Sequence, residues 1–318
     1  MKNKLFKVLK VTLPVSIGIY LTWYFISNSS ESEKDYFLKS LSEANYLWIL
    51  VALVIAFLSH LSRAYRWKYL LETLDLKPKL SLMYHSVMIG YIINLTIPRS
   101  GELARAAYFS RYQKTKPDKI FGTIVIERVV DLIMFALVFF IAFLFQADQE
   151  KFNQFRQIST SSSNPLLLPI FIVIGVLSVI LLVGFKKVRF KAINFLIGIT
   201  QGATAILRLK NKTAFLMHTL FIWSGYLAML WITALALPDL QNITINAVFA
   251  CFIGGTIAIG ATPGGIGLYP IMVAGALIEM YGYDGQIAKS FGMLMWTSQT
   301  AFMILLGIIS LIAIKKEN

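Results

Sequence analysis

The sequence predicts an all-α polytopic membrane protein with about six full spans and two re-entrant helical hairpins. Of its 318 residues, 57% are hydrophobic and only 14% are charged, which is too apolar for a soluble domain of this length. The apolar residues gather in runs long enough to cross a bilayer, and no stretch alternates as the strands of an outer-membrane barrel do. The basic residues lie mostly in short segments between these runs, as expected of cytoplasmic loops.

Composition also narrows the function classes. The net charge of +14 is spread over short loops, so it fits anionic lipid headgroups better than the single footprint of a nucleic-acid-binding protein. The single cysteine, Cys251, excludes an intramolecular disulfide framework, and the three histidines lack metal-ligand spacing. The sequence contains no phosphate-binding loop for ATP and no dinucleotide fingerprint. We therefore expect no metal, no cofactor and no nucleic-acid partner.

The first span follows four lysines and runs to Ile26. The polar stretch after it has no cleavage pattern, so we expect an uncleaved span with a cytoplasmic N-terminus. The acidic segment 28–45 is expected to be an external loop. A second span, 46–62, returns inward and is followed by the basic residues Arg63, Arg66 and Lys68.

The next apolar run, 82–98, poses a charge problem. If it crossed the membrane, six lysines and arginines between residues 99 and 119 would face outward. A hairpin over about 81–115 that enters from the cytoplasm and turns near Pro98 avoids this. The sequence therefore predicts a re-entrant element here.

The remaining elements follow the same logic. Full spans are expected at 121–145, 165–185, 213–237 and 287–314, and the last ends in Lys315 and Lys316 on the inside. The segment 192–209 is either an amphipathic helix on the membrane surface or an ordinary connecting helix.

Two apolar arms around a glycine-proline turn, over about 243–281, predict a second re-entrant hairpin that enters from outside. The single transmembrane domain 1–318 then consists of two halves, 1–146 and 165–318. Each reads span, span, hairpin, span in opposite orientations, which is the pattern of an inverted repeat. The alternative is that both glycine-proline turns are kinks in ordinary membrane helices.

The first hairpin carries the strongest site signal. Ser100 is expected to cap a helix whose N-terminal N–H groups, together with nearby guanidinium groups, suit an oxyanion such as phosphate. Glu102 is spaced to pair with either neighbouring arginine when no ligand is bound. The candidate residues in this hairpin are Pro98, Arg99, Gly101, Glu102 and Arg105.

A second group lies in the span that follows. Glu127, Arg128 and Asp131 could pair with the hairpin arginines or with one another, and an internal ion-pair lock without a ligand is the competing interpretation. A proton-carrying role for Glu127 or Asp131 is also open. In the second hairpin, the turn containing Pro263, Gly264, Gly265 and Gly267 is expected to let the backbone approach a headgroup and to supply N–H donors.

Three blocks of sequence resemble the lysylphosphatidylglycerol synthase transmembrane-region family, also called flippase-like. They are IPRSGELARAAYFSR at 97–111, IERVVD at 126–131 and TPGGIG at 262–267. The resemblance covers essentially the whole chain and implies a bacterial cytoplasmic-membrane protein that moves lipids or lipid-linked molecules between leaflets. Relatives often carry a glutamate shortly after the glycine motif, where this chain has Leu268, Tyr269 and Pro270. Because the chain ends at Asn318, the aminoacyl-transferase activity of larger members is not expected.

The resulting expectation is a lipid flippase, not an enzyme, that binds an anionic lipid or lipid-linked phosphate in the bacterial inner membrane. Both termini should be cytoplasmic. A membrane-embedded transferase acting on a lipid phosphate and a secondary transporter of a small anionic solute remain alternatives. Homo-oligomerisation is left open.

Overall fold

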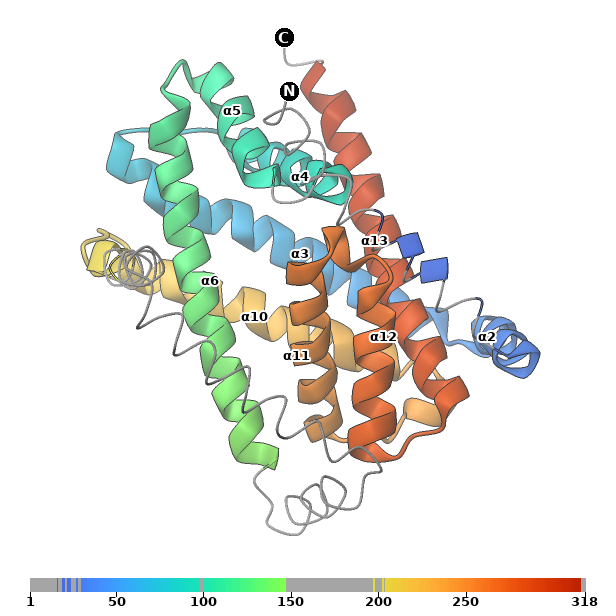
Figure 1. Cartoon of the computed structure of the whole chain (residues 1–318). Helices are drawn as coiled ribbons and strands as arrows, with labels where there is room; N and C mark the ends of the chain where they lie inside the picture. Colours follow the sequence, from blue (N-terminus) through green and yellow to red (C-terminus); the bar gives the residue numbers. More distant parts are fainter. Residues whose placement is uncertain are drawn as a thin grey trace, which may run out of the picture. The chain divides into compact units, whose positions relative to one another are not determined.

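The computed structural model describes residues 16, 19, 20, 22, 23, 27, 30–97, 100–146, 197, 202 and 204–315 (Figure 1). Within these ranges every regular element is helical, in agreement with the predicted all-α class. The chain divides into two compact units, one of residues 1–124 and 210–318 and one of residues 125–209.

Four of the described helices are long and apolar enough to cross a membrane. They are α3 (Tyr46–Leu71), α6 (Pro117–Gln146), α10 (Lys212–Ala234) and α13 (Gly285–Lys315). They match the spans predicted from residues 46, 121, 213 and 287. The span predicted at 165–185 lies outside the described residues, and so does most of the first span and of segment 192–209.

The two predicted hairpins are both present as helical hairpins. The first consists of α4 (Leu80–Thr96) and α5 (Gly101–Gln113). The second consists of α11 (Ile245–Ala261), the short 3-10 turn η3 (Pro263–Gly265) and α12 (Leu268–Gly275), which continues as the π-helical turn η4 (Ala276–Met280). In each hairpin the two arms pack against each other. These helices lie in the predicted ranges 81–115 and 243–281, and the re-entrant path of each hairpin stays a prediction.

Both hairpins break their first arm in the same way. Ile97 (φ −124°, ψ 109°) and Thr262 (φ −122°, ψ 155°) are extended residues that directly precede a proline. A proline disfavours the helical conformation in the residue before it, and it lacks the N–H that would continue the helix. In both turns the residue before the proline is therefore extended, although it is Ile97 in the first turn and Thr262 in the second.

Two boundaries differ from the sequence prediction. The acidic segment expected to be a loop contains α2 (Glu31–Glu43), because the side chains of Ser30 and Glu33 form a complete capping box. In addition, α3 continues beyond the predicted end at residue 62 to Leu71. Arg63 and Arg66, which were expected to mark a cytoplasmic loop, are consequently buried in the body of the helix.

In the larger unit, α3 and α10 run side by side, and α13 packs against α2, α4 and α12 (Figure 1). The core of this unit is filled by large side chains that are fully buried, including Trp67, Phe109, Phe215 and Phe291. This packing fixes α4 between α5, α3 and α13 and so positions the first hairpin.

Candidate functional site

The tip of the first hairpin is fastened by an asparagine that the sequence reasoning missed. The Asn94 side-chain oxygen accepts a hydrogen bond from Gly101 N–H (2.7 Å), and its amide nitrogen lies 3.5 Å from Glu102 Oε2. Ser100 is the N-cap residue of α5, as predicted, but the expected side-chain cap is not formed, because its hydroxyl donates to the Ile97 carbonyl (2.6 Å) instead. Asn94 is a lone polar residue near the end of an apolar arm, which was the available signal.

Pro98 and Arg99 lie outside the described residues. Gly101 is placed at the closest approach of α4 and α5, where a Cβ atom would collide with the Gly90 carbonyl oxygen and lie 2.6 Å from the Asn94 side chain. Gly90 faces it across the same contact, where an added Cβ atom would lie 3.0 Å from the Gly101 carbonyl oxygen. The glycine predicted to serve a ligand therefore has a packing role within the hairpin.

Arg105 is 4% exposed, and its guanidinium carbon lies 3.7 Å from the centroid of the Trp67 ring on α3. Trp67 is itself held by a hydrogen bond from its indole N–H to the Thr123 hydroxyl (2.9 Å). A buried cation stacked on an indole face is stabilised by the ring quadrupole. The contact with the ring uses the flat face of the guanidinium group. The N–H bonds of Arg105 point along the guanidinium plane and therefore not at the ring.

The second tip has a strongly constrained backbone. Gly264, Gly265 and Gly267 all have positive φ angles, between 58° and 76°, a region that non-glycine residues rarely adopt. Two of the N–H groups that were expected to face a ligand bond within the turn, Gly265 to the Thr262 carbonyl and Ile266 to the Pro263 carbonyl. The tip is therefore a closed turn whose donors are partly used by its own backbone.

The two tips meet. A Cβ atom on Gly264 would collide with the Leu95 side chain near the end of α4, so Leu95 packs directly on the glycine turn. Trp296 of α13 secures this turn, because its indole N–H donates to the Gly264 carbonyl (3.0 Å). The structure thus brings the two turns, which lie far apart in the sequence, into contact.

In the smaller unit, α6 carries the acidic candidates. Glu127 is fully buried, and the Arg128 guanidinium lies 3.2 Å from the Asp131 carboxylate. Of the pairings considered for these three residues, the one between Arg128 and Asp131 is therefore observed. Gly202 lies beside Val129 of the same unit, where a Cβ atom would be 2.8 Å from a valine methyl group.

The interface of α3 with α10 contains a polar seam that the sequence reasoning also missed. Arg63 donates to the Tyr226 hydroxyl (3.1 Å), and Arg66 donates to the Thr219 hydroxyl (3.1 Å). Ser62 is hydrogen-bonded to the His218 ring (2.8 Å). Two of these α3 residues are four apart and two are three apart (Ser62 and Arg66, Arg63 and Arg66), and this helical spacing of polar residues was the signal for the seam. Their burial stabilises the pairing of two long membrane helices through interhelical hydrogen bonds.

Comparison with known proteins gives the following results. A family model described as the lysylphosphatidylglycerol synthase TM region matches residues 11–307. A UPF0104 membrane protein of Methanocaldococcus jannaschii is 28% identical over 113 residues, which are 35% of this chain and 33% of that protein. The chain thus aligns with about a third of the length of this relative. No solved structure matches the chain.

Proposed function

Because the chain belongs to the lysylphosphatidylglycerol synthase transmembrane-region family and is an integral membrane protein, we propose that it moves an anionic lipid between the leaflets of the membrane. The family membership agrees with the resemblance of the three sequence blocks. The transported molecule in this proposal is a phospholipid or a lipid-linked phosphate, bound by its headgroup at the first hairpin.

The observation that carries the proposal is the contact between the two hairpin tips. Leu95 from the first half of the chain packs on Gly264 from the second half. Broken helices that meet in this way form the substrate sites of many transporters built from inverted repeats. The first arm of each hairpin and the second arm of the second hairpin are short and apolar, and a proline follows each first arm in the sequence, as expected of such elements.

The charge of the headgroup follows from the residues of the first hairpin. Arg99 lies at its turn in the sequence, and Arg105 lies on the arm that follows. Guanidinium groups bind phosphate oxygens through paired N–H donors, so they favour an anionic headgroup over a neutral one. Because the Asn94 side chain already engages the Gly101 N–H at the start of α5, arginine side chains supply the main donors in this proposal.

The test is leaflet exchange of fluorescent lipids in proteoliposomes. We expect the unaltered protein to exchange phosphatidylglycerol. In Arg99→Ala the exchange rate should fall by about tenfold or more, since a charge-assisted hydrogen bond is lost. Arg105→Ala should act in the same direction. Arg111→Ala is the matched control, because Arg111 lies on α5 but is exposed, and its exchange rate should be unchanged.

Each outcome has a defined meaning once the folded state of every variant has been checked by gel filtration. Equal rates in Arg99→Ala and Arg111→Ala would place the headgroup site elsewhere. Exchange by none of the proteins would contradict phospholipid translocation. In that case mass spectrometry of lipid extracts, with and without the protein, would test the transferase alternative.

A further inference from the structure

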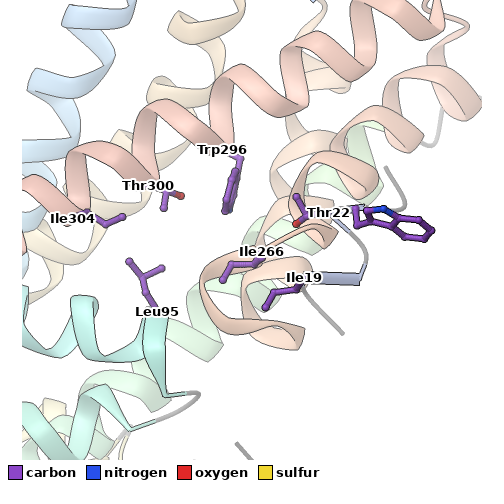
Figure 2. A pocket seen from close by; sticks show the side chains of 8 residues that line it. Ile19, Thr22, Leu95, Ile266, Trp296, Thr300 and Ile304 are labelled. Carbon is purple, nitrogen blue, oxygen red and sulfur yellow. The ribbon is translucent and has the colours of Figure 1, made fainter. Parts of the chain in front are cut away.

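A cavity of about 470 Å³ opens where the two hairpin tips approach α13 (Figure 2). Three of its lining residues, Trp296, Thr300 and Ile304, are spaced four apart and therefore form one stripe along α13. Leu95 reaches into it from the end of α4 and Ile266 from the second tip, as Figure 2 shows. The cavity is completed by residues near the N-terminus, namely Ile19, Thr22 and Trp23.

Among the residues that the structure describes, the lining is hydrocarbon and indole, with two threonine hydroxyls and no charged side chain. It is thus chemically separate from the arginine-bearing arm α5. Its depth in the membrane follows from α13, which has 31 residues and is about 46 Å long at 1.5 Å per residue. Trp296 and Thr300 lie near the middle of this helix, so they face the hydrocarbon layer when α13 spans the bilayer.

The cavity is open to its surroundings on one side. Of its lining side chains, Ile304 is 38% exposed and Trp23 is 62% exposed. A cavity lined by apolar groups does not hold ordered water, because water needs polar partners. In a bilayer the molecules that reach such an opening are lipid chains. The volume falls in the range of sites that bind small ligands, about 300–1,000 Å³.

We propose that this cavity binds one acyl chain of a membrane phospholipid. The inference deepens the proposed function, on which it rests, by assigning a tail site to the lipid whose headgroup the first hairpin is proposed to hold. A chain in this position contacts Leu95 and Ile266 together. It therefore interacts with both hairpins, and its binding energy depends on how the tips meet.

The experiment measures quenching of tryptophan fluorescence by bromine atoms in the chain. The full-length protein in detergent micelles is titrated with phosphatidylglycerol whose acyl chains are brominated. We expect saturable quenching, with an amplitude that falls in Trp296→Phe. Trp223→Phe is the control, because Trp223 is buried between α10 and α11 and should leave the saturable component unchanged.

A matched pair of filling variants then locates the site on α13. Ile304→Phe narrows the cavity. It should raise the lipid concentration at half-maximal quenching by about tenfold or more. Ile308→Phe adds the same group one turn further along, at a side chain that is 45% exposed and outside the cavity lining, and should leave the midpoint unchanged. Thr300→Val, which keeps the shape and removes a hydroxyl, should also bind normally.

Quenching that rises linearly without saturation, or that responds equally to Ile304→Phe and Ile308→Phe, would overturn the proposal. Because the measurement reports binding and not movement, its result is independent of the exchange assay. Saturable quenching without leaflet exchange would support the chain site and contradict translocation. Exchange without saturable quenching would support translocation and contradict the chain site.

Discussion

At the scale of single residues, the hairpin tips depend on side chains that are small or apolar more than on charged ones. Gly264 has a left-handed backbone and is in contact with Leu95, so two separate demands exclude a side chain there. Arg105, by contrast, is held on the Trp67 ring inside the protein. The contact between the tips therefore depends on α4, which carries Leu95, whereas the buried cation Arg105 belongs to α5.

The first prediction concerns Gly264. Gly264→Ala should destabilise the protein by about 1–3 kcal/mol, because the new methyl group strains the left-handed backbone and collides with Leu95. The midpoint of thermal unfolding in detergent is the measurement. Gly260→Ala is the matched control, since Gly260 is helical and has open space where its Cβ atom would be placed. Equal shifts in the two variants would contradict the tip contact.

At the scale of elements, the start of α5 is determined by the arm that precedes it. Asn94 belongs to α4, yet it caps α5 through Gly101 N–H, so the two arms are joined by a side chain as well as by the chain itself. The same principle holds for α2, which is attached to the rest of the unit at two points. Glu33 accepts a hydrogen bond from Lys289 of α13 (2.8 Å), and the Tyr36 hydroxyl donates to Asp239.

The second prediction separates the two capping candidates. Asn94→Ala should destabilise α5 by about 1 kcal/mol, the usual cost of a lost N-terminal cap, and accelerate hydrogen exchange at the amides of its first turn. Ser100→Ala should leave this exchange unchanged, because its hydroxyl bonds to the Ile97 carbonyl. The opposite pattern would show that Ser100 is the cap.

The third prediction concerns pH. Partial burial raises the pKa of the Glu33 carboxyl, but hydrogen bonds from Lys289 and from Ser30 N–H outweigh it, and the pKa lies below the usual 4.5. A lowered pKa contributes stability above the unfolded value, and this stability is lost as the pH falls through the folded value. Burial, followed by the bond to Asp239, raises the pKa of Tyr36 to about 12. The Tyr36 hydroxyl therefore stays protonated at every pH of this experiment, and its bond to Asp239 does not depend on its own titration.

Hydrogen exchange of the α2 amides, corrected for intrinsic rates, should therefore be constant down to about pH 5 and accelerate below it. Glu33→Gln should exchange faster at neutral pH and lose most of this dependence. An unaltered pH profile in Glu33→Gln would rule out the Lys289 contact as its cause.

At the scale of the whole molecule, the open question is how the hairpins enter the membrane. The two hairpins have first arms of equal length, 17 residues, and the same break before a proline. An inverted repeat places both ends of the first hairpin on the cytoplasmic side and both ends of the second on the outer side. Two crossing helices would instead place the ends of each hairpin on opposite sides.

The fourth prediction tests this arrangement by cysteine labelling in a Cys251→Ser background, which removes the single native thiol. Lys79→Cys and Lys114→Cys flank the first hairpin and should react with a membrane-impermeant maleimide only after the cytoplasmic side is exposed. Thr244→Cys and Tyr283→Cys flank the second and should react from outside in intact cells. Reaction of the two ends of one hairpin from opposite sides would refute re-entry.

The described fold was largely predictable where it depends on local properties of the chain. Apolar runs identified α3, α6, α10 and α13, and prolines that cannot continue a helix located both turns. Asn94, Arg63 and Arg66 were misjudged because their roles depend on partners in other elements. A basic residue at the end of an apolar run reads as a loop charge unless its partner, such as Thr219, is known.

The sequence by itself therefore determined the membrane class, the two helix breaks before prolines and the family, since hydropathy, proline geometry and motif order are written along the chain. Only the tertiary structure decided that Leu95 packs on Gly264, that Arg105 stacks on Trp67 and that an apolar cavity lies beside the tips. These features arise from residues far apart in the chain, and side-chain packing, which no local pattern encodes, brings them together.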